Sequence, residues 1–387
     1  MVLSETDITK LRASLASKRY ATGTSTHDFY HYPARFSPEI ARAVIETCSS
    51  LEDWVLDPFM GGGTTVIEGL ALRRRVIGVD INSLAHFVAS VRTRPLSKND
   101  RQQLLSWAEL VAAQYCKNVS DVERSQVLNL PKSVDLFISG ALDLAPRLLT
   151  KPRRHAFARC ALLRLGQWAL DCRDFSAPTV RRLAERLPAL VAEMLAGMDE
   201  FVTACRASGV SIKNLTKRRV LLNRSAVGVA GDPALARIRV RPRLVFTSPP
   251  YAGVHVLYHR WQYRGRKETA APYWIADVQD GAGASYYTAG SRTPTGLKNY
   301  FNTIVSAFKS VRAVIDPEGL VVQLVGFSRT SEQLPQYLEA MSQAGFAEYE
   351  GMPEGGFGRR VPNRKWYARV RAAGDASSEV LLIHRPV

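Results

Sequence analysis

The chain has 387 residues, 46% of them hydrophobic, which is enough to bury one large core or two moderate ones. It carries 52 Lys and Arg against 35 Asp and Glu, and the net charge of +17 at pH 7 predicts a polyphosphate partner, nucleic acid above all. No apolar run is long enough to cross a bilayer and the first residues lack the pattern of a secretory leader, so we expect a cytoplasmic protein with no membrane partner.

Three kinds of pattern divide the chain. Residues 1–25 form a polar N-terminal segment to which we assign no function. Strand and helix patterns alternate over 26–95 and again over 211–387, whereas 96–210 shows helical periodicity with no strand signal. We therefore predict one α/β domain that is interrupted by a helical insertion.

The α/β domain opens with two predicted strands and the helix between them. An apolar run over 54–56 is followed by a glycine-rich string that leads into a helix, Asp57-Pro58-Phe59-Met60-Gly61-Gly62-Gly63-Thr64-Thr65. A second apolar run, over 76–79, ends at Asp80. Strand, glycine loop, helix and strand in this order indicate a parallel sheet with crossover helices.

The glycine-rich string predicts a ligand-binding loop, because glycines let backbone approach a ligand and a helix N-terminus offers unpaired N–H groups. A dinucleotide fingerprint would need glycine where Val66 stands, and a phosphate-binding loop would need lysine after Gly63. Asp80 is in the position where an acid accepts hydrogen bonds from both ribose hydroxyls of an adenosine. A helix N-cap is the alternative role for Asp80.

The helical insertion contains two apolar stripes with helical spacing. The first consists of Leu104, Trp107, Val111 and Tyr115. The second, with Pro188 as an expected kink, consists of Val180, Leu183, Leu187, Leu190, Met194 and Met198. Because the insertion also carries basic residues, it is a candidate DNA-binding or target-recognition subdomain.

Apolar runs that complete the sheet return after residue 211. The predicted strands cover 220–222, 227–229, 244–246, 319–325 and 380–383, with helices near 300–314 and 333–344.

The most specific string in the chain is Leu244-Val245-Phe246-Thr247-Ser248-Pro249-Pro250-Tyr251. Two consecutive prolines fix φ and remove two N–H donors, so the turn presents carbonyl acceptors in a rigid frame. That frame suits the exocyclic amine of a nucleic-acid base: Ser248 and the Pro249 carbonyl would accept its N–H protons, and Tyr251 would stack on a base that has left the duplex. A plain turn after a strand is the alternative for this string alone.

Together, the string from Asp57 to Thr65 and the Ser248-Pro249-Pro250-Tyr251 motif resemble the S-adenosylmethionine-dependent amino-methyltransferases of DNA. Serine at the first motif position is typical of the cytosine-N4 enzymes, whereas an acid or Asn is more common in adenine-N6 enzymes. The resemblance implies a Rossmann-like, seven-stranded sheet with a reversed last strand.

The resemblance also implies a set of cofactor-binding residues. The segment His31-Tyr32-Pro33-Ala34-Arg35-Phe36-Ser37-Pro38 is similar to the one that helps hold the methionine end of the cofactor, through Tyr32, Pro33 and Phe36. Gly231-Asp232 resembles the acid at the third strand that contacts the adenine amine. The remaining cofactor residues are Asp57, Pro58, Phe59, Gly61, Gly63, Thr64 and Asp80.

Basic residues outside the two motifs are the predicted nucleic-acid contacts, although a solvated face is the alternative for any one cluster. They are Arg153, Arg154, Lys217, Arg218, Arg219, His259, Arg260, Arg364 and Lys365. The last two lie next to Trp366-Tyr367, and charge combined with stacking groups is typical of a nucleic-acid groove.

The residues argue against two other chemistries. His255 and His259 lie four apart, but no nearby carboxylate or cysteine completes a metal site, and the five cysteines show no paired spacing, so we expect no metal. Cytosine-C5 methylation needs a cysteine nucleophile after a proline, and no Pro-Cys dipeptide occurs.

We therefore expect a site-specific DNA-methyltransferase that acts on cytosine N4 by direct in-line transfer, with Ser248, Pro249, Pro250 and Tyr251 as the catalytic motif. A cognate restriction endonuclease or another defence-system protein is a candidate partner. An adenine-N6 or RNA base-amine methyltransferase and a catalytically silent DNA-binding module are the alternatives.

Overall fold

The computed structural model describes residues 2–16, 25–32, 36–117, 123–171, 176–238, 241–251, 260–264, 267–281, 290–291, 293–361 and 377–387.

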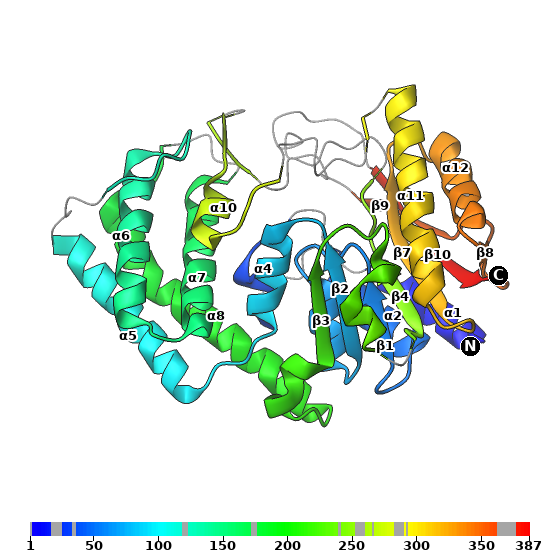
Figure 1. Ribbon diagram of the computed structural model, residues 1–387, viewed down its shortest axis with the longest axis horizontal. Coiled ribbons are helices and arrows are strands. Elements are labelled where there is room, and N and C mark those ends of the chain that lie inside the picture. The colour runs from blue at the N-terminus through cyan, green and yellow to red at the C-terminus, as the bar shows by residue number, and fades with distance from the viewer. Residues whose placement is uncertain are drawn as a thin grey trace.

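A mostly parallel sheet forms the centre of the α/β part (Figure 1). In spatial order its strands are β3 (Arg219–Asn223), β2 (Arg75–Asp80), β1 (Trp54–Asp57), β4 (Leu244–Thr247), β7 (Leu320–Phe327), β10 (Ser377–Pro386) and β8 (Phe346–Glu348). The first five strands are mutually parallel, and β10 runs antiparallel to its neighbours. This arrangement confirms the predicted Rossmann-like α/β fold with a reversed late strand.

Within the described residues the sheet has eight strands instead of the predicted seven, because two short strands share its last edge. β9 (Phe357–Val361) pairs with one end of β10, and β8 pairs with the other end. Between them, Gly355 and Gly356 have positive φ values of 72° and 75°. A Cβ on Gly356 would lie 2.2 Å from the Leu381 carbonyl oxygen, so this close approach requires glycine.

Helices cover both faces of the sheet. On one face α1 (Glu5–Ser14) and α2 (Pro38–Cys48) share a buried cluster with β4, β7 and β10. On the other face α11 (Pro294–Val314) and α12 (Thr330–Gln343) pack with the short elements η3 (Val229–Gly231) and α9 (Pro233–Ala236). Since side chains of β1, β4 and β7 are buried on both faces, these strands appear in the sequence as continuous apolar runs.

In the described part of the N-terminal segment, residues 2–16, α1 buries Leu11 completely against the sheet layer. One prediction about the α/β part is wrong. The apolar run 227–229 is not a strand: Gly228 adopts a φ of 74° and the chain turns there into η3. Val229 is fully buried where η3 packs on α11, whereas Val227 is 40% exposed.

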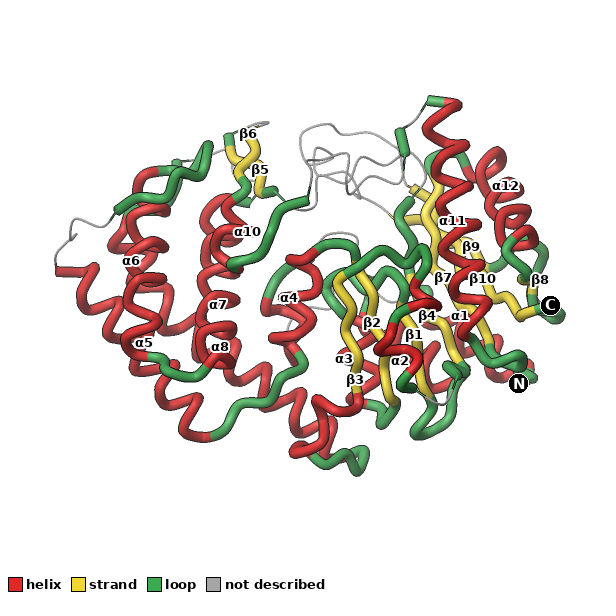
Figure 2. The backbone as a smooth tube through the Cα atoms, in the orientation of Figure 1, coloured by secondary structure: helices red, strands yellow, loops and turns green. Residues whose placement is uncertain are grey.

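The predicted helical insertion consists of α5 (Lys98–Lys117), α6 (Lys132–Leu148), α7 (Pro152–Leu170) and α8 (Val180–Ala207), followed by η2 (Ile212–Arg218). It stands beside the sheet, next to α4 (Ser83–Arg92) (Figure 2). The hairpin of β5 (Trp261–Tyr263) and β6 (Lys267–Thr269) and the short helix α10 (Ala271–Ala276) pack on it. Both apolar stripes lie in its core except for the half-buried Val180, and Pro188 lies within α8 without ending that helix.

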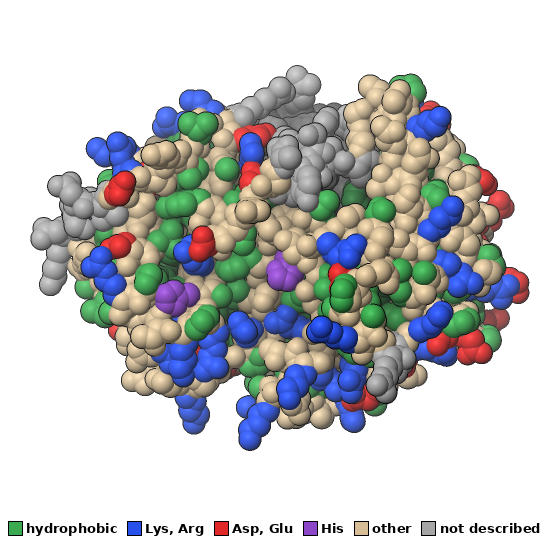
Figure 3. All heavy atoms as spheres, in the orientation of Figure 1, with side chains coloured by type: hydrophobic (Ala, Val, Ile, Leu, Met, Phe, Trp, Pro, Cys, Tyr) green, Lys and Arg blue, Asp and Glu red, His purple; other side chains and the backbone are tan. Residues whose placement is uncertain are grey.

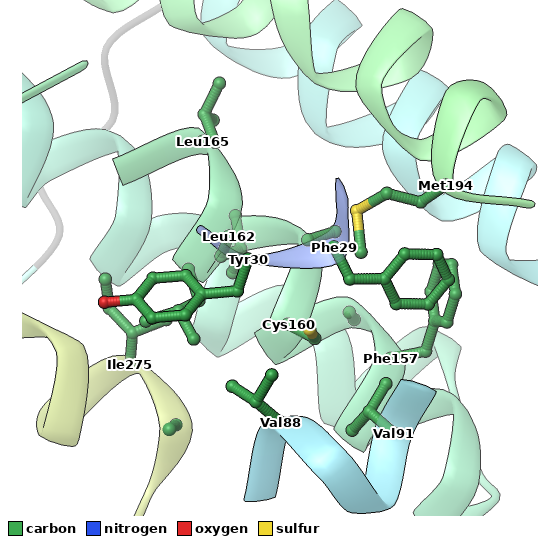
Figure 4. Packing of buried hydrophobic residues seen from close by; sticks show 14 of the residues in the cluster. Phe29, Tyr30, Val88, Val91, Phe157, Cys160, Leu162, Leu165, Met194 and Ile275 are labelled. Atoms are coloured by element: carbon green, nitrogen blue, oxygen red, sulfur yellow. The ribbon is translucent and has the colours of Figure 1, made fainter. Parts of the chain in front are cut away.

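The core of the insertion continues into the α/β part (Figure 4). Phe29 of η1 (Ser25–Phe29) meets Phe157 of α7 edge to face, with ring centroids 5.6 Å apart. Val88 and Val91 of α4 belong to the same cluster, as does Met194 of α8. The helices are therefore joined to the sheet by a shared hydrophobic core and not by a linker.

Side-chain caps define several helix starts. The Asn82 side chain accepts a hydrogen bond from Leu84 N at the start of α4, and Thr179 and Thr293 cap α8 and α11 in the same way. Asn82, and not Asp80, is thus the N-cap of α4, so the alternative role considered for Asp80 is wrong.

Candidate active site

The glycine loop and the Ser-Pro-Pro-Tyr turn meet at the carboxyl ends of two neighbouring parallel strands. β1 and β4 pair in register, Leu56 opposite Val245. The Thr247 hydroxyl at the end of β4 donates a 2.6 Å hydrogen bond to Asp57 at the end of β1. Because crevices at the carboxyl ends of parallel strands are where α/β sheets bind ligands, the two predicted motifs form one candidate site.

Asp57 lies beneath the glycine loop and fixes its position. It is fully buried, and its carboxylate accepts hydrogen bonds from Thr247 and from the Phe59 backbone N–H at 3.1 Å. Burial raises the pKa of Asp57 to about 6, and the hydrogen bond from Thr247 opposes that rise. Asp57 therefore fixes the loop on the strand ends, as a structural residue beneath the site.

The loop itself has the geometry of a ligand cradle. Gly61 and Gly63 have φ values of 48° and 84°, and Gly63 precedes the first turn of α3 (Thr64–Ala71). Asp80 at the end of β2 accepts a 2.8 Å hydrogen bond from Gly61 N and another from Asn82 N. Desolvation raises the pKa of Asp80 to about 6, and these two N–H groups oppose it. A half-buried carboxylate with lone pairs to spare fits an acceptor for ribose hydroxyls.

Tyr32 lies directly against this loop. A Cβ on Gly62 would come within 2.8 Å of the Tyr32 Cβ, and one on Gly61 within 3.3 Å of its ring. The Tyr32 hydroxyl accepts a hydrogen bond from Asn82 Nδ2 at 3.3 Å. The predicted cofactor residue Tyr32 is therefore brought to the glycine loop from a segment that precedes β1.

Sequence reasoning missed the residue that connects this segment to the loop. Arg92, at the end of α4, is fully buried and donates to the carbonyl oxygens of Gly62, His27 and Tyr30. From the other side Gln167 of α7 binds both the backbone N–H and the carbonyl of His31, each at 2.9 Å. A charged residue on the apolar face of α4 was the only signal in the sequence.

Other predicted cofactor residues take different positions. Phe36 belongs to the buried core, and its ring packs on Phe246 of β4 with centroids 4.7 Å apart; its role as a cofactor contact stays a prediction. Asp232 caps α9 and forms an ion pair with Arg224 at 3.0 Å, nine residues beyond the end of β3. Asn223 is the residue that ends β3 opposite Asp80, and its amide donates to the Asp80 carbonyl at 3.1 Å.

Three further predicted cofactor residues are Thr64, Phe59 and Pro33. Thr64 is buried in the first turn of α3, and Phe59, after Pro58, packs toward Phe308 of α11 at 6.4 Å. Pro33 is not among the described residues.

The Ser-Pro-Pro-Tyr turn is anchored by hydroxyl groups. Ser248 Oγ lies 3.2 Å from the Tyr251 hydroxyl, and the Tyr300 hydroxyl of α11 donates to the Pro250 carbonyl at 2.9 Å. Tyr251 is only 6% exposed, and its hydroxyl donates to Glu379 of β10 at 3.1 Å. The Pro249 carbonyl follows Ser248 directly, so it remains the predicted second acceptor for an amine.

Glu379 is a second functional candidate that the sequence did not reveal. It is 2% exposed, and Arg359 of β9 donates to its Oε2 from Nε at 2.9 Å and from Nη2 at 2.6 Å. Glu379 stands on β10, more than a hundred residues beyond Ser248, so neither spacing nor periodicity links them.

The predicted nucleic-acid residues are dispersed. Arg154 is 4% exposed and, together with Arg153, forms an ion pair with the buried Asp100, so its assignment as a nucleic-acid contact is corrected. Burial would raise the pKa of Asp100, but hydrogen bonds from Ser97 and Arg154 outweigh it and hold the pKa well below the usual range. These groups fasten α7 to α5.

The basic run Lys217, Arg218 and Arg219 lies at the amino end of β3. Ser248 lies beyond the carboxyl end of β4, so the strands separate it from this run. Arg218 is bound to Glu52 at 3.0 Å, whereas Lys217 is exposed. On the face in Figure 3, Lys and Arg side chains gather along the lower part of the molecule, away from the strand carboxyl ends.

Arg260 lies in the part of the chain next to β5 and forms an ion pair with Asp280 at 2.8 Å, which raises its pKa. His255, His259, Arg364 and Lys365 lie outside the described residues.

No group of three or more His, Cys, Asp or Glu side chains within the described ranges could hold a metal ion. No helix in the described part of the chain has the length and apolar character needed to span a membrane.

Comparisons with known proteins support the resemblance. A family model described as DNA methylase, N6_N4_Mtase, matches residues 12–89, which include Tyr32, the glycine loop and Asp80. The chain is similar to the type II methyltransferase M.MvaI of Kocuria varians, with 34% identity over 84 residues, which are 21% of this chain and 18% of the relative. It is also similar to the type II methyltransferase M.MjaII of Methanocaldococcus jannaschii, with 25% identity over 97 residues, 25% of this chain and 18% of the relative.

The chain thus matches only 18% of the length of each of these relatives. Among solved structures, TrmN from Thermus thermophilus aligns over 94% of this chain and 52% of its own, with 11% identity and a TM-score of 0.34. That score is too low to support a conclusion. The resemblance to the N4/N6 DNA methyltransferase family predicted from the sequence is confirmed in the N-terminal part of the chain, and S-adenosylmethionine is the methyl donor that this family implies.

Proposed function

We propose that the protein transfers a methyl group from S-adenosylmethionine to the N4 amine of cytosine in DNA. The observation that carries the proposal is the hydrogen bond between Thr247 and Asp57, 2.6 Å long, which joins the Ser-Pro-Pro-Tyr turn to the glycine loop. This bond keeps the turn, whose Ser248 can accept a hydrogen bond from an amine, next to the loop that can hold the methyl donor.

The residues fit the donor. S-adenosylmethionine supplies an electrophilic methyl group on a sulfonium sulfur. The glycine loop allows close backbone approach, Asp80 offers a carboxylate to ribose hydroxyls, and Tyr32 borders the loop. Arg92 and Gln167 keep the segment with Tyr32 in place, so the cradle is ordered by contacts on both sides.

Ser248 and the Pro249 carbonyl act on the acceptor. The lone pair of an exocyclic amine is delocalised into the base ring, and accepting its N–H protons concentrates that lone pair on nitrogen. With S-adenosylmethionine bound, this nitrogen would attack the methyl carbon as the carbon–sulfur bond breaks, and the surplus amine proton would pass to water. No covalent enzyme intermediate is required.

The serine at position 248 favours cytosine N4 over adenine N6, and the family match of residues 12–89 favours DNA over RNA. The relatives are named type II methyltransferases, and this supports a place in a restriction-modification system beside a cognate endonuclease. The helical insertion is the proposed target-recognition or DNA-docking part.

The test is methyl transfer with tritiated S-adenosylmethionine on plasmid DNA, tRNA and rRNA, followed by nucleoside mass spectrometry. We expect label in DNA and N4-methylcytosine in the hydrolysate. N6-methyladenine, or label only in RNA, would assign the enzyme to one of its alternatives. Absence of transfer to every nucleic acid would contradict the proposal and support a silent binding module.

A further inference from the structure

A chain of hydrogen bonds runs from the reaction centre into the core. It begins at Ser248, passes through the Tyr251 hydroxyl at 3.2 Å and reaches Glu379 at 3.1 Å. Glu379 in turn receives two N–H groups from Arg359. Tyr251, Glu379 and Arg359 are at most 10% exposed, so solvent does not compete strongly for these bonds.

The direction of each bond in this chain follows from what its members can donate. Glu379, paired with a guanidinium, is an ionised carboxylate and accepts only. The single Tyr251 proton is therefore directed at Glu379, and the Tyr251 oxygen is left to accept from Ser248. The Ser248 proton points away from the crevice as a result, and its lone pairs are the groups that a ligand meets.

We propose that Glu379 is a positioning residue that sets this direction, making Ser248 a pure hydrogen-bond acceptor at the reaction centre. The inference rests on the proposed function and makes it more specific: the site is built for a substrate group that donates, such as an amine with two N–H bonds, and disfavours a group that only accepts. The Pro250 carbonyl already accepts a hydrogen bond from the Tyr300 hydroxyl. Ser248 and the Pro249 carbonyl are therefore the two acceptors that we assign to the amine.

Glu379→Gln tests the direction without changing the size of the side chain. Arg359 continues to require an oxygen at the Oε2 position, so the new amide nitrogen faces Tyr251. The new amide nitrogen would donate a hydrogen bond to the Tyr251 oxygen, and the Tyr251 proton would then be directed at Ser248. As a result the Ser248 proton would point at the amine of the substrate. We expect kcat for methyl transfer to fall on the order of 100-fold, with binding of S-adenosylhomocysteine changed less than about 3-fold.

Tyr251→Phe is the second variant, since it interrupts the chain while keeping the buried Arg359–Glu379 pair intact. The controls are Ser248→Ala and the double variants Ser248→Ala/Glu379→Gln and Tyr251→Phe/Glu379→Gln. If Glu379 acts through Ser248, its substitution has little effect on kcat in either background.

The opposite result is an equal loss of kcat from Glu379→Gln in all three backgrounds. That outcome would assign Glu379 a general structural or electrostatic role and overturn the inference, while wild-type activity would leave the proposed function intact. A wild-type protein that methylates no nucleic acid would instead contradict the proposed function itself, so the two failures can be told apart.

Discussion

If the proposed site holds the methyl donor, Asp80 should make its binding sensitive to pH. Asp80 must be ionised to accept from ribose hydroxyls while it also accepts from Gly61 and Asn82, and its pKa is raised to about 6. We expect affinity for S-adenosylhomocysteine to be constant above pH 7 and to fall as the pH drops through 6. Calorimetric titration between pH 5 and 8 measures this.

Asp57 has a similarly raised pKa and provides the matched control. Asp80→Asn should weaken binding at pH 7.5 by about 10-fold or more, the scale of one charge-assisted hydrogen bond, and abolish the pH dependence. Asp57→Asn should leave the dependence in place. The same affinity at pH 5 and pH 7.5 in the wild type would contradict the assigned role of Asp80.

His384 makes folding itself depend on pH. It lies on β10, is 1% exposed, and neither ring nitrogen has a hydrogen-bond partner among the described residues. Burial lowers its pKa from 6.5 to about 4. His384 therefore binds a proton more readily in the unfolded chain than in the folded one. The free energy of unfolding should be highest above pH 6.5 and decrease as the pH falls toward 4.

Between pH 7.5 and pH 5 this one residue should lower the free energy of unfolding by about 2 kcal/mol, because each pH unit below 6.5 removes about 1.36 kcal/mol until the pH approaches 4. Urea unfolding at pH 7.5, 6 and 5 measures it as the difference between the wild type and His384→Leu, which should lack this dependence. Parallel stability curves for the two proteins would contradict the prediction.

At the level of elements, the helical insertion and the sheet should unfold together. Phe157 of α7 packs on Phe29 of η1, the element next to the Tyr32 segment, so one core spans both parts. Phe157→Ala should lower the free energy of unfolding by about 3–5 kcal/mol, the cost of a large cavity in a closed core.

Thermal unfolding followed by calorimetry checks this prediction. A single transition at lower temperature is expected for Phe157→Ala. Leu110→Ala on the exposed side of α5, where Leu110 is 53% exposed, is the control and should shift stability by less than about 0.5 kcal/mol. Two separate transitions, with only one of them affected, would show that the insertion folds independently.

For the whole molecule, the net charge of +17 should make DNA binding strongly dependent on salt. Binding of a labelled duplex between 50 and 200 mM salt, followed by fluorescence anisotropy, should give a straight line in log Kd against log salt. Lys217→Ala should leave its slope unchanged, because Lys217 lies at the amino end of β3, roughly 15 Å of strand away from the carboxyl ends.

A slope reduced by about one in Lys217→Ala would show instead that Lys217 contacts a phosphate. DNA would then wrap around the sheet edge as far as the amino ends of the strands, where the sequence had suggested a contact.

The sequence alone was sufficient for features that depend on neighbouring residues. Strand runs, the glycine loop, the Pro-Pro turn and the helical stripes each follow from local periodicity or backbone restriction, and the fold class followed from their order. The local signal failed at 227–229, where an apolar run serves packing of η3, and at the last sheet edge, which two short strands share.

Only the tertiary structure decided which charged and polar groups meet. Arg92 donates hydrogen bonds to the carbonyl oxygens of Gly62 and His27. Arg154 binds Asp100, and Glu379 accepts a hydrogen bond from Tyr251. The physical reason is that these bonds join residues brought together by strand pairing and helix packing, far apart in the chain, so the type of a side chain is written in the sequence but its partner is not.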